Sequence, residues 1–198
     1  MKQPLESVHM TVILGLILTL IVAYVVASAG YSSAMDLYLP PADLIVRWLH
    51  VISGVMWIGL LWYFNFVQIP NMPNIPDDQK PAISKVIAPA ALFWFRWGAM
   101  ATIVFGLYLA QLNGYLVDAL MLNGGAKEVS IGIGMWLGLI MWFNVWFVIW
   151  PNQKKALGIV KADDDAKKAS ARVAMLFSRT NTLLSFPMLL AMVSAQNI

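Results

Sequence analysis

Long apolar stretches alternate with short polar ones along the chain. The windows without a charged residue cover 10–29, 48–75, 97–117, 129–153 and 180–198. Each is about long enough for a helix that crosses the hydrocarbon core of a bilayer, which takes about 20 residues. The pattern therefore predicts an all-α integral membrane protein, a bundle of five transmembrane helices near 10–30, 44–68, 90–112, 130–150 and 174–196.

The polar connections add detail to this prediction. Residues 70–81 contain four prolines and predict an irregular loop, and Pro151 is expected to end the fourth helix. Residues 154–173 alternate Lys, Asp and Ala around Leu157 and Ile159, a pattern typical of an interfacial helix with a charged face. No internal repeat is visible, so we expect residues 1–198 to form a single transmembrane domain.

The first apolar stretch has an alternative interpretation. Lys2, the apolar run and Ala27-Ser28-Ala29 resemble a secretory signal peptide with its cleavage site. The run is longer than the usual apolar region of a signal peptide, which favours a retained helix.

The positions of Lys and Arg predict the orientation. Of the 13 basic residues, only Arg47 and Lys127 fall on one side of the predicted membrane. The other side carries Lys2, Lys80, Lys85, Arg96, Lys154, Lys155, Lys161, Lys167, Lys168, Arg172 and Arg179. Because cytoplasmic segments carry the excess of Lys and Arg, we expect the N-terminus inside and the C-terminus outside.

Composition agrees with the membrane assignment and excludes several other classes. The chain is 60% hydrophobic and 12% charged, against about 45–50% and about 25% in soluble domains. It has no cysteine, which excludes a disulfide scaffold, Fe–S clusters, c-type haem attachment and thiolate zinc sites. The net charge of +3 does not indicate nucleic-acid binding, because the basic residues lie between apolar stretches and not on one polar face.

His50 is the strongest candidate for chemistry within the membrane. At 100° per residue it shares a stripe of the second helix with Gly54 and Trp57. A b-type haem needs an axial imidazole and small residues where the porphyrin lies against a helix, so this stripe predicts haem b with His50 as an iron ligand. The alternative is a structural histidine without a ligand role, hydrogen-bonded to a neighbouring helix or to interfacial water.

The second iron ligand stays open. His9 is the other histidine, and it lies near the opposite side of the predicted membrane. The remaining candidates are water, a residue of another subunit, or a methionine such as Met135, Met188 or Met192.

A second polar group lies near the expected cytoplasmic ends of the helices, and it consists of Asn65, Arg96, Asn144, Arg179 and Asn181. Two arginines at similar depth could bind haem propionates or a planar anionic substrate through bidentate hydrogen bonds. The alternative is that both arginines extend to lipid phosphates. That alternative does not explain the asparagines, which favour a site.

Four strings in order resemble one known family, the membrane domain of PuuD-type urate hydroxylases. They are Arg47-Trp48-Leu49-His50 with Trp57-Ile58-Gly59 and Tyr63-Phe64, then Trp94-Phe95-Arg96-Trp97, then the segment 142–155 (WFNVWFVIWPNQKK), then Ser178-Arg179-Thr180-Asn181 with Leu184, Pro187 and 191–194. The first string is also similar to HemJ-type protoporphyrinogen oxidases. The resemblance covers roughly 44–196, and Thr180 stands where the family pattern has histidine.

The resemblance implies a multi-helix domain of the bacterial inner membrane that oxidises urate and passes electrons outward, often to an attached cytochrome c. No such domain follows in this sequence, so the expected partner is a periplasmic cytochrome or a larger membrane complex. Three functions remain under consideration: a haem b redox or electron-transfer protein, a non-catalytic accessory subunit of a respiratory or photosynthetic complex, and, less favoured, a small-molecule transporter. No residue is assigned a catalytic role.

Overall fold

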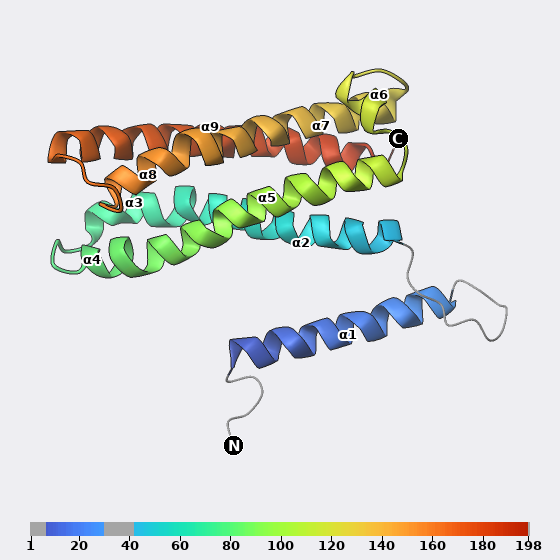
Figure 1. Cartoon of the computed structure of the whole chain (residues 1–198), viewed down its shortest axis with the longest axis horizontal. Coiled ribbons are helices and arrows are strands. Elements are labelled where there is room, and N and C mark those ends of the chain that lie inside the picture. The colour runs from blue at the N-terminus through green and yellow to red at the C-terminus, as the bar shows by residue number, and fades with distance from the viewer. Residues whose placement is uncertain (1–6, 30–41, 198) are drawn as a thin grey trace. The chain divides into compact units, whose positions relative to one another are not determined.

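The computed structural model describes residues 7–29 and 42–197, and within these ranges the chain is helical almost throughout and contains no strand (Figure 1). The chain divides into two compact units, residues 1–45 and 46–198. Each is described by itself.

Helix α1 runs from Val8 to Ala29, close to the predicted 10–30. Its 22 residues would span about 33 Å, enough for the hydrocarbon core. The hydroxyls of Thr11 and Thr19 donate to the carbonyls of Ser7 and Gly15, one turn earlier. These groups are therefore satisfied inside the helix, as lipid requires. That α1 crosses the membrane stays a prediction.

Four helices in the described part of the chain are long and apolar enough to cross a bilayer: Ala42–Asn74, Lys80–Leu112, Ala126–Ala156 and Asp164–Ser194. The first contains α2 (Ala42–Trp62), η2 (Tyr63–Gln68), α3 (Ile69–Asn71) and η3 (Met72–Asn74). The second contains α4 (Lys80–Ala82), η4 (Ile83–Ile87) and α5 (Ala88–Leu112). The third contains α7 (Ala126–Phe143), η5 (Asn144–Ile149) and α8 (Trp150–Ala156), and the fourth is α9 (Asp164–Ser194). The short α6 (Leu116–Leu120) lies in the connection before α7. The chain is thus a multi-pass helical membrane protein whose apolar helices fit a lipid bilayer.

Residues 154–173, expected to form an interfacial helix, are not one continuous helix. Helix α8 ends at Ala156, where Gly158 adopts a φ of +72° that favours glycine. Helix α9 then begins after Asp163, whose carboxylate accepts a hydrogen bond of 2.7 Å from the amide of Ala166. Residues 164–173 are therefore the first turns of the last membrane helix.

The proline-rich connection is shorter than the predicted 70–81. The second apolar helix continues through Pro70 to Asn74, and the next begins at Lys80 with Pro81 in its first turn, where a missing N–H costs nothing. Likewise Pro151 does not end the fourth predicted helix, which continues to Ala156.

Three of these helices contain one wider, π-helical turn shortly before a proline. The π-helical segments η2, η4 and η5 end at Gln68, Ile87 and Ile149, each two residues before a proline. Proline lacks the N–H for the ordinary i→i−4 bond and its ring clashes with the carbonyl there. A local change of hydrogen-bond pattern keeps the helix continuous beside these three prolines. Pro187 lies inside α9 without such a segment.

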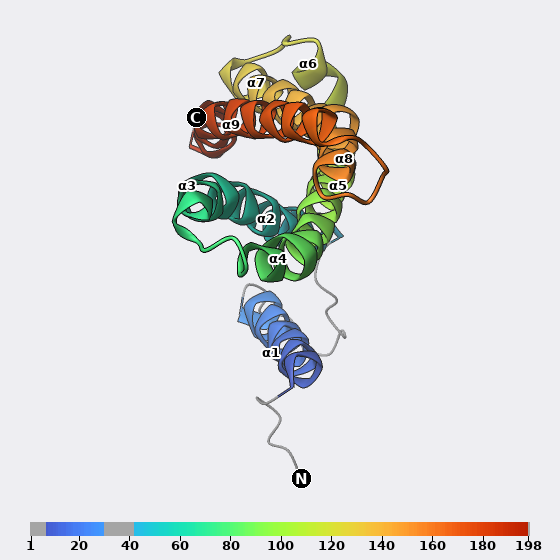
Figure 2. The same cartoon turned by 90° about the vertical axis from the view of Figure 1, so that its left-hand side faces the viewer.

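The unit 46–198 is a bundle in which α7 lies along α9 and contacts α5 on its other side (Figure 2). Its core is centred on Trp57, Leu61, Phe95, Met141 and Val145, which are almost fully buried. Helices α2 and α5 approach closely at Gly98, where a Cβ atom would lie 3.3 Å from the backbone nitrogen of Trp57.

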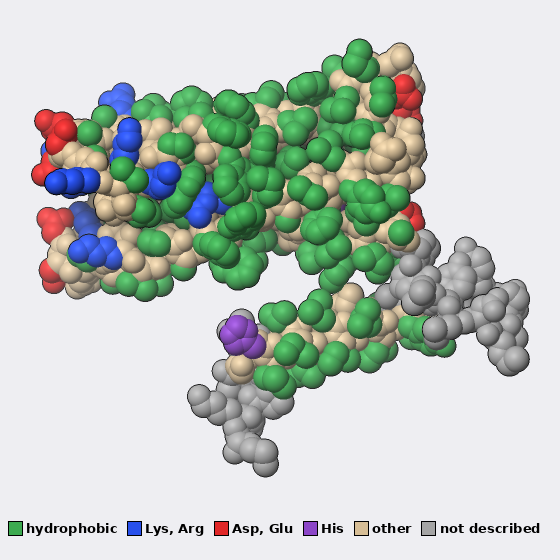
Figure 3. All heavy atoms as spheres, viewed as in Figure 1, with side chains coloured by type: hydrophobic (Ala, Val, Ile, Leu, Met, Phe, Trp, Pro, Cys, Tyr) green, Lys and Arg blue, Asp and Glu red, His purple; other side chains and the backbone are tan. Residues whose placement is uncertain are grey.

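Lysine and arginine gather at one end of this bundle. Figure 3 shows them around α4, α8 and the start of α9. We call this the lysine-rich end, and it contains the connections 75–79 and 157–163. The opposite end contains α6, the start of α2 and the end of α9 (Figure 1).

Candidate functional site

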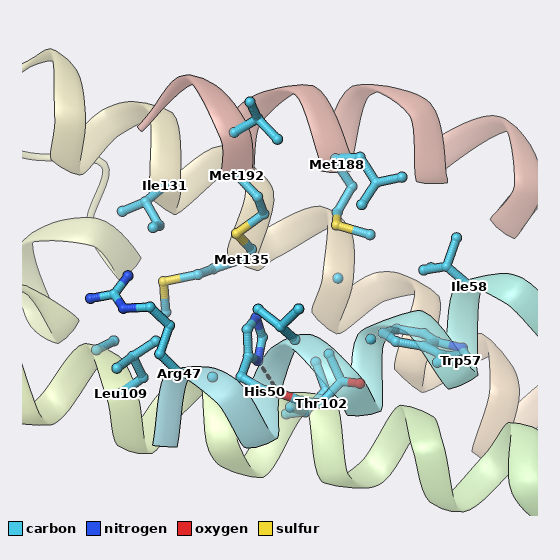
Figure 4. A pocket seen from close by; sticks show the side chains of 18 of the residues that line it. Arg47, His50, Trp57, Ile58, Thr102, Leu109, Ile131, Met135, Met188 and Met192 are labelled. Carbon is cyan, nitrogen blue, oxygen red and sulfur yellow. Dashed lines mark hydrogen bonds between the residues drawn. The ribbon is translucent and has the colours of Figure 1, made fainter. Parts of the chain in front are cut away.

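A cavity of about 670 Å³ opens between α2, α5, α7 and α9 (Figure 4). Hydrogen bonds between α2 and the C-terminal segment mark its two ends. Trp62 Nε1 donates to Ser185 Oγ over 3.0 Å, and Arg47 Nη1 donates to Gln196 Oε1 over 3.4 Å. Most of the lining is apolar, and the volume is within the range of about 300–1,000 Å³ found for small-molecule sites.

His50 stands in this cavity with one ring nitrogen already used. Its Nδ1 lies 2.9 Å from the backbone carbonyl oxygen of Thr102 on α5 (Figure 4). A carbonyl oxygen can only accept, so Nδ1 carries the proton and donates. In the neutral ring this leaves the Nε2 lone pair free, which is the arrangement seen in metal-binding histidines.

Gly106 makes room for the imidazole. A Cβ atom at this position would lie 2.8 Å from His50 Cε1 and 3.0 Å from Nδ1. Gly54, one turn after His50, has free space instead, because its Cβ would meet only Thr102 Cγ2 at 3.9 Å. Both glycines and Trp57 line the cavity. All three haem-site residues expected from the sequence, His50, Gly54 and Trp57, therefore lie together.

Three methionines line the cavity from α7 and α9, on the other side from His50 (Figure 4). Met135 and Met188 are buried. Met192 packs against Gly134, where a Cβ atom would lie 3.1–3.2 Å from three of its side-chain atoms. The cavity thus contains one imidazole and three thioethers, which are the protein ligands of His/Met haem sites.

Arg47 supplies the positive charge of the cavity, and the sequence interpretation missed it. It lies three residues before His50, a spacing that places both side chains on one helix face. Tyr115 also lines this end of the cavity. Burial raises the pKa of its phenol, although the charge of Arg47 acts in the opposite direction. The phenol therefore stays neutral and can donate a hydrogen bond.

The second predicted group does not line this cavity, and its asparagines connect helices. Asn144 Nδ2 donates to Asn181 Oδ1 over 2.8 Å, and Asn181 Nδ2 donates to the carbonyl of Met141 over 2.9 Å. Asn65 Nδ2 donates to Ser178 Oγ over 2.8 Å. Helix α9 is thereby bonded to α7 and to η2.

The two arginines of that group have different environments. Arg96 is half-buried, and its guanidinium lies over the ring of Trp150. Arg179 is exposed and has no hydrogen bond or ion pair with another described residue. Thr180 is exposed as well, and its hydroxyl donates to the carbonyl of Leu176 in its own helix.

We expect Asn181→Leu to destabilise the bundle by about 1–3 kcal/mol, because the buried amide of Asn144 then loses its acceptor. The double variant N144L/N181L should recover part of the loss, since no unpaired donor remains. Thermal unfolding in detergent, followed by tryptophan fluorescence, measures both. Asn152→Leu is the control, because Asn152 bonds only a carbonyl of its own helix. Equal losses in N181L and N152L would contradict the role of the amide pair.

Within residues 7–29 and 42–197, no three His, Cys, Asp or Glu side chains gather in a way that could hold a metal ion by themselves.

Comparison with known proteins gives a family match for the C-terminal part of the chain. Residues 123–197 match the family model described as Urate oxidase N-terminal. The match covers α7, η5, α8 and α9, and it confirms the resemblance seen in the strings at 142–155 and 178–194; the strings around His50 and Arg96 lie outside it. No curated protein and no solved structure matches the chain.

Proposed function

We propose that this chain is a membrane redox protein that binds one haem b in the His50 cavity and takes part in electron transfer. When bound, haem b supplies reversible one-electron chemistry. The observation that carries the proposal is the bond from His50 Nδ1 to the Thr102 carbonyl. It orients the imidazole and leaves Nε2 as the ligand atom within an apolar cavity of suitable volume.

The other cavity residues have complementary roles in this proposal. Gly54 and Gly106 leave space beside the imidazole, and Trp57 closes the cavity toward the core. We assign the propionate contact to Arg47, because Arg96 and Arg179 do not line the cavity. Arg47 forms no ion pair with a described carboxylate. Its guanidinium has the geometry for bidentate binding of a propionate carboxylate. Met192, Met188 and Met135 are the candidates for the second iron ligand.

The orientation belongs to the same proposal. The lysine-rich end faces the cytoplasm of a bacterial inner membrane, α1 forms a fifth span, and the C-terminus lies outside. The positive-inside rule and the basic residues at that end support this (Figure 3). The His50 cavity then lies in the periplasmic half, within reach of a periplasmic cytochrome or a larger complex as electron partner. The family match supports a urate-hydroxylase-like protein, and we propose no substrate.

The test is the visible spectrum of the purified full chain. We expect a Soret band and a pyridine haemochrome equivalent to about one haem b per chain, with a thioether signature for the second ligand. The absence of both from the protein as isolated and after addition of haemin would overturn the proposal. A haem-free chain that co-purifies with a respiratory or photosynthetic complex would instead support the accessory-subunit alternative.

Gly106→Ala should lower haem occupancy about tenfold without unfolding the chain. The new methyl group needs the space of His50 Cε1 and displaces the ring from the Thr102 carbonyl; a lost second-shell bond to a ligand histidine typically costs 10–100-fold in metal affinity. Haemin titration measures the effect. Gly59→Ala is the matched control, because Gly59 also lines the cavity but nothing lies within 4 Å of its Cβ position. Unchanged affinity in G106A would show that the ring orientation is unimportant.

A further inference from the structure

Two cationic side chains lie against one tryptophan ring outside the His50 cavity. Arg96 Cζ lies 3.3 Å from the centroid of the Trp150 ring, and Lys154 Nζ lies 5.7 Å from it. Both distances are within the range of about 6 Å for cation–π contacts. Trp150 therefore fixes a pair of positive charges beside one indole.

No carboxylate balances this pair within the described residues. The ion pairs of the described chain join Lys80 to Asp77 and Lys167 to Asp164, and Arg96 and Lys154 are in neither. Arg96 Nη1 is also buried and without a hydrogen-bond partner. A buried donor on a charged group is costly to leave unpaired. The arrangement therefore lacks an anionic acceptor.

Neighbouring side chains offer further unpaired polar atoms. Trp146 Nε1 and Gln153 Oε1 are buried without partners, four residues before and three residues after Trp150. The Trp146 ring packs against Trp97, the neighbour of Arg96, with centroids 5.5 Å apart. The group thus combines donors for an oxyanion with one acceptor for a hydroxyl.

The location of this group identifies the source of the anion. It lies in the half of the bundle where lysine and arginine gather (Figure 3), and the helix that carries Trp150 ends within two turns of it, at Ala156. Tryptophan is enriched at membrane–water interfaces, and basic pockets between membrane helices bind phospholipid headgroups. A phosphodiester oxygen can accept from a guanidinium, an indole N–H or an ammonium group, and a headgroup hydroxyl can donate to an amide oxygen.

We propose that Arg96, Trp150 and Lys154 form a binding site for the phosphate of an anionic phospholipid with a hydroxylated headgroup, such as phosphatidylglycerol. The site is separate from the His50 cavity, since none of the three residues lines that cavity. It does not depend on haem binding.

Native mass spectrometry of the full chain in detergent tests the site with phosphatidylglycerol and phosphatidylcholine of the same acyl chains. We expect the wild type to prefer phosphatidylglycerol about tenfold or more, and Arg96→Gln to remove most of that preference. Lys154→Gln should weaken it about fivefold. Lys155→Gln is the matched control: it removes the same charge one residue further on, from an exposed side chain without a contact to Trp150.

Several outcomes would overturn the proposal. Equal binding of the two lipids would exclude recognition of the anionic headgroup, and equal losses in K154Q and K155Q would reduce it to general charge attraction. Displacement of the lipid by low millimolar inorganic phosphate would assign the site to a soluble oxyanion instead. If R96Q does not fold, Arg96→Lys takes its place: it keeps the charge but not the bidentate geometry, and it should lose part of the preference for phosphatidylglycerol. Full preference in both single variants, R96K and K154Q, would also count against the site.

Discussion

Replacing His50 with alanine should abolish the Soret band of the purified chain. His50 is the imidazole that lines the cavity, and its Nε2 is the free nitrogen. Without this imidazole the cavity would offer haem b only thioether or water ligands, which hold it weakly. Absorption of protein purified from cells, normalised by the pyridine haemochrome, measures the loss.

The chain offers a matched control for this variant. His9, the other histidine of the sequence, is exposed on α1, so His9→Ala should leave the spectrum unchanged. Added imidazole should restore a Soret band to H50A, because the vacated space can admit the free ring. A full haem complement in H50A, or loss of haem in H9A, would refute the assignment of His50 as the ligand.

Replacing Gly132 with alanine should give the largest loss of stability among the glycine variants. The Cβ atom would lie 2.1 Å from the backbone carbonyl oxygen of Ala119 in α6, so the backbones of α6 and α7 must separate. Overpacking of this kind costs about 1–3 kcal/mol and occasionally more. It exceeds the gain of about 0.5–1 kcal/mol that alanine brings to a helix interior. We expect a net loss of about 2 kcal/mol in detergent unfolding.

Gly138→Ala tests whether the contact, and not the residue type, decides the result. Gly138 lies on the same helix, and its Cβ would meet only Ile103 Cδ1 at 3.9 Å, an ordinary contact. This variant should keep or slightly raise the unfolding midpoint. Similar midpoints for G132A and G138A would contradict the close approach of α6 and α7.

The sequence predicts the part of the site that lies on one helix. His50, Gly54 and Trp57 follow from 3.6-residue periodicity, and the structure places all three at one cavity. Thr102 and Gly106, which orient the imidazole from α5, depend on a contact across 52 residues. No local pattern identifies such partners. Arg47 could have been found, because it lies one turn before His50 on the same helix.

The polar group expected near the cytoplasmic ends shows the opposite outcome. Their similar depth in the predicted membrane led us to expect Asn65, Asn144 and Asn181 to lie together with Arg96 and Arg179. The structure instead bonds the asparagines to their neighbouring helices and leaves Arg179 exposed. A buried amide in lipid can hydrogen-bond to whatever backbone or side chain is near. Depth alone therefore does not distinguish a ligand site from a helix connection.

The widened turns before Pro70 and Pro151 also affect how surface exposure should be mapped along these helices. An extra residue in one turn rotates everything beyond it by about 100°. A helical wheel drawn without interruption through 63–68 or 144–149 would therefore assign the lipid-facing positions of α3 and α8 one residue out of phase. Cysteine-accessibility scans of these helices should be interpreted with two helical wheels, one before and one after the π-helical segment. Deletion of a single residue within η2 or η5 would make one uninterrupted helical wheel valid for the whole helix.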